Sequence, residues 1–184
     1  MIAASALARI LHPLKRRRIR AAAVRSVALA ISCLISYLLI THTLAHVYSL
    51  STSDDLLGGM WAVLATVFVY RDNQKQSRAA ASSRIMATSL SFALCLIYLL
   101  IFPFHPWGLA VLIGIGSLVL TLIGRPEDVV TAAITTAVVM VVAGLSPHNA
   151  WEQPLLRVAD TIVGIGVGLG ASWITTRLTF AQGA

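Results

Sequence analysis

The feature that most constrains this chain is a series of long apolar runs separated by short polar breaks. Six runs approach the ~20 residues that a helix needs to cross a bilayer. They cover residues 24–41, 56–70, 85–102, 107–123, 129–145 and 158–173. The breaks between them are too short to hold a second domain. The pattern predicts an all-α, polytopic integral membrane protein whose six transmembrane helices form one domain over residues 21–180.

Composition supports the same class. Of the 184 residues, 58% are hydrophobic and 11% are charged, whereas a soluble domain has about 25% charged residues. A globule of this size could not bury so much apolar surface, because small domains bury the smallest fraction of their chain. We therefore exclude a disordered chain, a nucleic-acid-binding globule and an ordinary cytosolic enzyme.

The positions of the cations predict an orientation. Every Lys and Arg except Arg157 falls on one side of the six runs, and in short loops such a bias places that side in the cytoplasm. We expect both termini inside, residues 1–20 as a cytoplasmic basic N-terminal arm, and insertion in the cell inner (plasma) membrane. The net charge of +7 then reflects topology, and no nucleic-acid partner is expected.

The second run is the shortest of those that must cross on this scheme. Residues 56–70 span about 22 Å at ~1.5 Å per residue, against a hydrocarbon core of roughly 30 Å. We expect either polar turns to extend this helix or neighbouring helices to shield it. Trp61, Trp107 and Trp151 fall near predicted outer ends, which is typical of an interfacial aromatic belt.

Four motifs follow one another in a recognisable order. Residues 60–71 read Met-Trp-Ala-Val-Leu-Ala-Thr-Val-Phe-Val-Tyr-Arg, and a basic loop leads to Arg-Ile-Met-Ala-Thr at 84–88. Arg-Pro-Glu-Asp at 125–128 then opens a run, and Arg-Val-Ala-Asp-Thr-Ile-Val-Gly stands at 157–164. Their order and spacing resemble the FUSC (fusaric acid resistance protein-like) membrane module of the aromatic acid exporter superfamily, over roughly residues 20–176. Plant aluminium-activated malate channels look like distant relatives.

The chain departs from the family pattern in its third run. The glycine that precedes Thr88 in the family is Ala87 here, and the usual later glycines are Ser89, Ser91 and Ala93. The resemblance implies efflux of small organic anions, such as aromatic carboxylates, by proton-coupled alternating access. Two alternatives stay open, a passive anion channel and a non-transporting membrane scaffold or partner subunit.

The sequence offers little for catalysis. It has no nucleophile–base pair, metal-ligand cluster or phosphate-binding loop that we recognise, so we expect no enzyme activity and no cofactor. The partners expected are the lipid bilayer, a small organic anion and a second copy of the chain, as a homodimer or another homo-oligomer.

Two short matches suggest an internal repeat. Arg84-Ile85-x-x-Thr88 and Arg157-Val158-x-x-Thr161 are each predicted to open the last helix of a three-helix half. Three is odd, so the halves would cross the membrane in opposite senses. Such inverted repeats are common in transporters, whose binding sites lie near the repeat interface.

The same motifs supply the candidate binding residues. Arg84 and Arg157 either anchor helix ends at the headgroups or face the interior and attract an anion, because a guanidinium holds a carboxylate through two parallel hydrogen bonds. Asp160 is placed to pair with Arg157 at i,i+3 or to serve as a proton-coupling carboxylate. The full candidate set is Arg84, Arg157, Asp160, Trp61, Thr88 and Thr161.

Three further features have structural explanations. Glu127 and Asp128 stand at a helix start, where negative charge interacts favourably with the helix dipole, so capping is a sufficient explanation of these two residues. Gly164, Gly166, Gly168 and Gly170 form small-xxx-small surfaces for helix packing within or between protomers. His42 and His46 with Asp54 or Asp55 could bind zinc or sense pH, but no recognised ligand spacing links them and we expect no metal.

Overall fold

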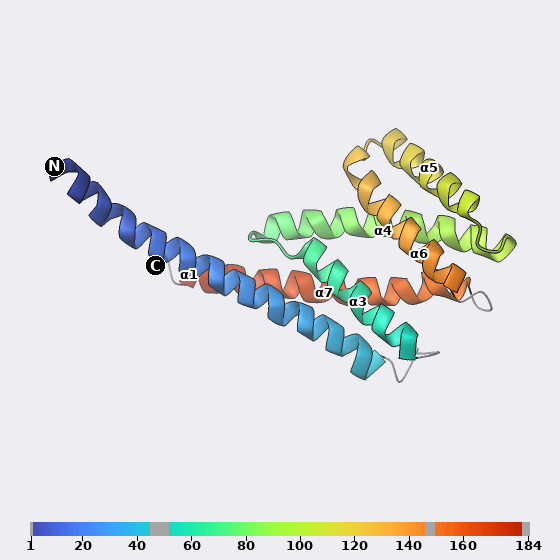
Figure 1. Cartoon of the computed structure of the whole chain (residues 1–184), viewed down its shortest axis with the longest axis horizontal. Coiled ribbons are helices and arrows are strands. Elements are labelled where there is room, and N and C mark those ends of the chain that lie inside the picture. Colours follow the sequence, from blue (N-terminus) through green and yellow to red (C-terminus); the bar gives the residue numbers. More distant parts are fainter. Residues whose placement is uncertain (1, 45–51, 146–149, 182–184) are drawn as a thin grey trace.

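The computed structural model describes residues 2–44, 52–145 and 150–181, and those residues form helices and short connections without a strand (Figure 1). The predicted all-α class is confirmed. In chain order the elements are α1 (Ile2–Leu38), a π-helical segment η1 (Leu39–Leu44), α3 (Thr52–Val69), α4 (Gln74–Ile101), α5 (Pro106–Leu122), a 3₁₀ turn η2 (Pro126–Asp128), α6 (Val129–Leu145) and α7 (Glu152–Ala181).

The helices carry the apolar surface of a membrane protein. Four segments are long and apolar enough to cross a bilayer by length and composition, namely Ala21–His42, Gln74–Ile101, Pro126–Leu145 and Glu152–Arg177. Asp55–Val69 and Pro106–Leu122 are shorter apolar helices. Large side chains such as Leu100, Leu118, Val130 and Ile162 point out of the bundle, where lipid rather than water suits them. The count of six crossings stays a prediction.

Helix α3 is both extended and shielded, the two solutions expected for the short second run. The helix begins at Thr52, four residues before the apolar run, which brings its length to about 27 Å at ~1.5 Å per residue. Its inner face is enclosed by protein, because Ala62, Ala65 and Thr66 are fully buried. The polar groups on this face of the helix therefore contact protein rather than the hydrocarbon.

Two helix starts differ from the prediction. Helix α4 begins at Gln74, where the side chain of Asn73 accepts a hydrogen bond from the backbone N–H of Lys75, and α7 begins at Glu152. Arg84 and Arg157 therefore lie inside their helices, and the prediction that they open them was wrong. Hydropathy marks only the apolar part of a helix, while its first polar turns add length that hydropathy does not reveal.

The packing of the six helices has an internal regularity. Helices α4 and α7 pack side by side and run in opposite directions (Figure 1). Helix α3 packs on α7 as α6 packs on α4, α1 packs on α3 as α5 packs on α6, and α1 packs on α7 as α5 packs on α4. Exchanging the triplet α1–α3–α4 with α5–α6–α7 therefore leaves this set of neighbours unchanged.

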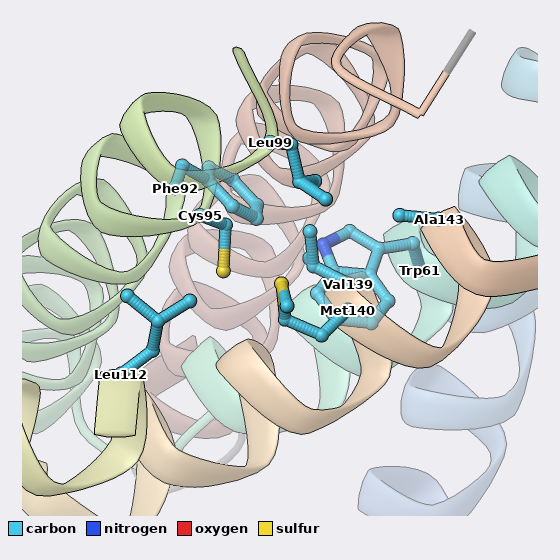
Figure 2. Packing of buried hydrophobic residues seen from close by; sticks show 8 residues of the cluster. All are labelled: Trp61, Phe92, Cys95, Leu99, Leu112, Val139, Met140 and Ala143. Carbon is cyan, nitrogen blue, oxygen red and sulfur yellow. The ribbon is translucent and has the colours of Figure 1, made fainter. Parts of the chain in front are cut away.

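The largest buried cluster lies where α3, α4, α5 and α6 meet. Figure 2 shows Phe92, Cys95 and Leu99 of α4 facing Val139 and Met140 of α6, with Trp61 of α3 alongside. The rings of Trp61 and Phe92 are tilted, with centroids 6.4 Å apart, a favourable aromatic arrangement. This cluster packs Trp61 against α4, next to the candidate site.

Candidate functional site

Arg84 lies in the bundle interior, ten residues after the start of α4. Only 3% of its surface is exposed. Its guanidinium carbon is 4.7 Å from the centroid of the Phe68 ring and 5.9 Å from that of the Trp61 ring. Desolvated cation–π contacts of this kind contribute about 2 kcal/mol. An Arg that anchors a helix end at the headgroups would be exposed, so this placement does not fit the anchoring alternative.

The polar atoms beside Arg84 are incompletely satisfied. Among the described residues, neither Nε of Arg84 nor Oγ1 of Thr88, one turn later on α4, has a hydrogen-bond partner, and both atoms are buried. Leaving such an atom buried and unpaired costs about 1–3 kcal/mol. Nor does any carboxylate of the described chain form an ion pair with Arg84. A bound acceptor would relieve these costs.

Trp61 connects this region to α7. Its indole Nε1 donates a 2.9 Å hydrogen bond to Oγ1 of Thr161, and that hydroxyl in turn donates to the carbonyl oxygen of Arg157 at 2.7 Å. Trp61 is 2% exposed, so the aromatic-belt prediction was wrong for it, whereas Trp107 is 80% exposed and Trp151 is also exposed. A tryptophan in a belt must reach the membrane surface, and Trp61 is enclosed by α4 and α7.

Arg157 and Asp160 form a buried ion pair on α7. Arg157 donates to Asp160 at 2.8 Å and to the side-chain oxygen of Gln153 at 3.3 Å, as the i,i+3 spacing predicts. Space for the carboxylate comes from Gly58 of α3, where an added Cβ would lie 3.0 Å from one Asp160 oxygen and 3.1 Å from the other. Glycine at 58 thus lets the charged pair lie against α3.

All six candidate residues lie in one region around Trp61. Arg84 and Thr88 come from α4, while Arg157, Asp160 and Thr161 come from α7, and the indole of Trp61 contacts Arg84 of the first helix and Thr161 of the second. Trp61, Gln153 and Arg157 line a crevice of about 10 Å³ together with apolar residues of α3 and α6. That volume holds about one water molecule. The crevice is therefore closed to an organic anion in this conformation.

Asp128, predicted only to cap a helix, has further contacts in the structure. Asp128 is 1% exposed, accepts a hydrogen bond from the hydroxyl of Ser83 on α4, and pairs with Arg125 at 3.3 Å. Arg125 and Asp128 have the same i,i+3 spacing as Arg157 and Asp160, and this repeated Arg-x-x-Asp was the available signal.

The four alternating glycines of α7 divide into two faces. A Cβ on Gly164 would lie 2.3 Å from the carbonyl oxygen of Ala62, and one on Gly168 would lie 3.1 Å from that of Thr66. Both therefore pack on α3 within the same chain. A Cβ on Gly166 or Gly170 would meet nothing within 4 Å.

These contacts predict unequal effects of adding a methyl group. Gly164→Ala is expected to force α7 away from α3 and to lower the free energy of unfolding by about 1–3 kcal/mol, the usual cost of overpacking. Gly166→Ala is the matched control and should leave stability unchanged or slightly improved, since alanine favours helix more than glycine does. Thermal denaturation of both variants in detergent measures this, and equal melting temperatures would contradict the assigned packing.

The zinc alternative receives no support from the described residues. Within them, no group of three or more His, Cys, Asp or Glu side chains is placed to hold a metal ion. His46 and the side chain of Asp54 lie outside the described part of the chain. That alternative therefore stays a prediction.

Comparison with known proteins assigns the family. A family model described as fusaric acid resistance protein-like matches residues 40–171, which include α3 to α6, most of α7 and every residue of the candidate site. Neither a search of curated proteins nor a search of solved structures found a match. The family is one of membrane transporter-like proteins. Because the match covers more than half of the chain, this protein belongs to the fusaric acid resistance protein-like family.

Proposed function

We propose that this protein is a carrier that exports small organic anions, with aromatic carboxylates as the substrate class, across the inner (plasma) membrane. The observation that carries the proposal is Arg84, a buried guanidinium without a carboxylate partner among the described residues. An uncompensated cation inside an apolar bundle is expensive. An anionic substrate would supply the missing charge during each transport cycle.

The surroundings of Arg84 suit an aromatic carboxylate. A guanidinium can hold a carboxylate by two parallel hydrogen bonds along its edge, and a guanidinium that does so can also stack on an aromatic ring such as that of Phe68, 4.7 Å away. The hydroxyl of Thr88 could donate a further bond, because its oxygen is unpaired. The rings of Trp61 and Phe92 would then offer aromatic contacts to the substrate.

The proposed transport cycle uses two inverted three-helix repeats. Arg84 and Arg157 are 73 positions apart, as are Thr88 and Thr161. Ala62 and Ala132 are 70 positions apart, as are Thr66 and Thr136 in the same two helices. The exchange of triplets described above supports this correspondence. Rocking of one repeat against the other would expose a central site alternately to each side.

Corresponding positions also make corresponding contacts. Gly164 meets the carbonyl of Ala62 on α3, and Ser91, 73 positions before Gly164, donates a 2.9 Å hydrogen bond to the carbonyl oxygen of Ala132 on α6. Close approach through glycine at one crossing is thus replaced by a hydroxyl bond at the other. This gives the departure from the family's glycine pattern at Ser91 a physical explanation.

The assembly and the coupling are part of the same proposal. Asp160 would exchange the coupling proton, because it is a buried carboxylate on α7 and is paired with Arg157, which lines the crevice. A homodimer would place the open Gly166 and Gly170 face of α7 toward a second copy, where small residues permit close helix contact. Light scattering of the detergent-solubilised protein measures the copy number, and a monomer would contradict this part.

Transport by the full chain in liposomes tests the function. We expect a pH gradient to drive accumulation of labelled phthalate, and the uncharged ring compound benzamide neither to be accumulated nor to compete. Protein-free liposomes give the background. Single-channel currents that need no proton gradient would contradict the carrier in favour of a channel, and absence of any anion movement would favour a scaffold.

A further inference from the structure

The buried carboxylate of Asp128 is tied to the helix that carries Arg84. Asp128 belongs to η2, at the start of α6. It accepts a hydrogen bond from the hydroxyl of Ser83, the residue directly before Arg84 on α4. Arg125 approaches from the side, with more than a third of its own side chain exposed. A cap needs none of this burial or this tertiary contact, so capping alone does not account for Asp128.

The two Arg–Asp pairs lie at corresponding helix contacts, although they belong to non-equivalent helices. In the proposed repeat, α6 and α4 correspond to α3 and α7, and residue 128 of η2 corresponds to Gly58 of α3. Asp128 contacts α4 at Ser83, while Gly58 contacts α7 at Asp160. The residue of α4 that corresponds to Asp160 is Ala87, which lies one helical turn after Ser83. The contact of α6 with α4 and the contact of α3 with α7 therefore each include one buried carboxylate.

We propose that Asp128, with Arg125 and Ser83, is an inner latch matched to an outer latch formed by Arg157 and Asp160. Because the repeats are inverted, the two latches close opposite ends of the same path. The inner latch joins the start of α6 to α4 beside the anion site through the Ser83–Asp128 hydrogen bond, and the outer latch packs its carboxylate against α3 at Gly58. Asp128 is thus a positioning residue that controls access to Arg84 without contacting the substrate.

Thiol accessibility tests the latch without a substrate. In a Cys33→Ser, Cys95→Ser background, Ala87→Cys reports on the inner seam, since Ala87 is buried with Ala132 of α6. Leu57→Cys reports on the outer crevice beside Arg157. We expect Asp128→Asn to raise the rate at which a water-soluble maleimide labels position 87 at least tenfold and to lower labelling at position 57. Ser83→Ala should act in the same direction more weakly.

Asp72→Asn is the matched control, because it breaks the exposed Arg25–Asp72 pair and should leave both labelling rates unchanged. Unchanged labelling at position 87 in Asp128→Asn would overturn the latch. Faster labelling at both positions would also overturn it, since that is general loosening rather than opening at one end.

This inference rests on the alternating access proposed above, yet the two can fail separately. Opposite changes at positions 87 and 57 without any phthalate transport would support the latch and refute the proposed cargo. Gradient-driven phthalate transport with unchanged labelling would support the carrier and refute the latch.

Discussion

Replacing Arg84 by glutamine is expected to abolish gradient-driven phthalate transport. Glutamine keeps a polar side chain at this position but removes the charge and the paired donors of the guanidinium. Hydrogen bonds to charged groups contribute about 1.5–3 kcal/mol each, so losing two should raise KM on the order of a hundredfold or more. Initial rates in liposomes measure the loss. Arg84→Lys restores the charge without the planar fork and should recover only part of the activity.

The same substitution should stabilise the protein while inactivating it. The buried guanidinium of Arg84 has no carboxylate partner among the described residues, so a neutral side chain removes an uncompensated charge from the bundle. Arg25→Gln is the control, because Arg25 is half exposed and its partner Asp72 is exposed too. We expect that variant to transport normally. A fully active Arg84→Gln protein would remove Arg84 from the mechanism.

Replacing Asp160 by asparagine is expected to uncouple transport from the proton gradient. Asparagine has nearly the same volume as aspartate but cannot take up and release a proton. Asp160→Asn liposomes should therefore lose accumulation against a gradient while still exchanging labelled for unlabelled phthalate. The paired measurement of accumulation and exchange separates coupling from binding. Accumulation that persists unchanged would exclude Asp160 as the coupling carboxylate.

A second variant keeps the coupling test valid if the single variant folds poorly. Asp160→Asn removes the negative charge that lies 2.8 Å from the buried Arg157 guanidinium, and breaking a buried ion pair costs about 3–5 kcal/mol. The double variant Arg157→Gln, Asp160→Asn removes both charges and should recover most of that stability. It should remain unable to accumulate phthalate. A double variant with full accumulation would contradict the role of Asp160 as clearly as the single variant would.

The apolar part of the fold was predictable because bilayer crossing leaves a local signal. Each of the six apolar runs corresponds to a helix, and the i,i+3 spacing predicted the pairing of Arg157 with Asp160. The helix starts were not predictable to the same degree. Polar first turns such as Gln74–Ser77 extend a helix beyond its apolar part, so Arg84 was predicted at a helix end rather than ten residues inside.

Two features depend on contacts between distant parts of the chain. Trp61 lies near an end of its apolar run, and only its contacts with α4 and α7 show that it belongs to the interior. Asp128 stands in an Arg-Pro-Glu-Asp turn, where helix capping is a sufficient local explanation. Its hydrogen bond, however, joins it to Ser83, 45 positions earlier. No local pattern reports such a partner, although the second Arg-x-x-Asp in the sequence was a clue.

The central claim is that six helices cross the membrane in two inverted halves, and sidedness of labelling tests it most directly. Gln76→Cys places a thiol in the first turn of α4, and His105→Cys places one shortly after the end of that helix. Both native side chains are exposed. In a background without Cys33 and Cys95, an impermeant maleimide should label position 76 only from the cytoplasmic side and position 105 only from outside. Labelling of position 76 from outside, or of both positions from one side, would contradict the account.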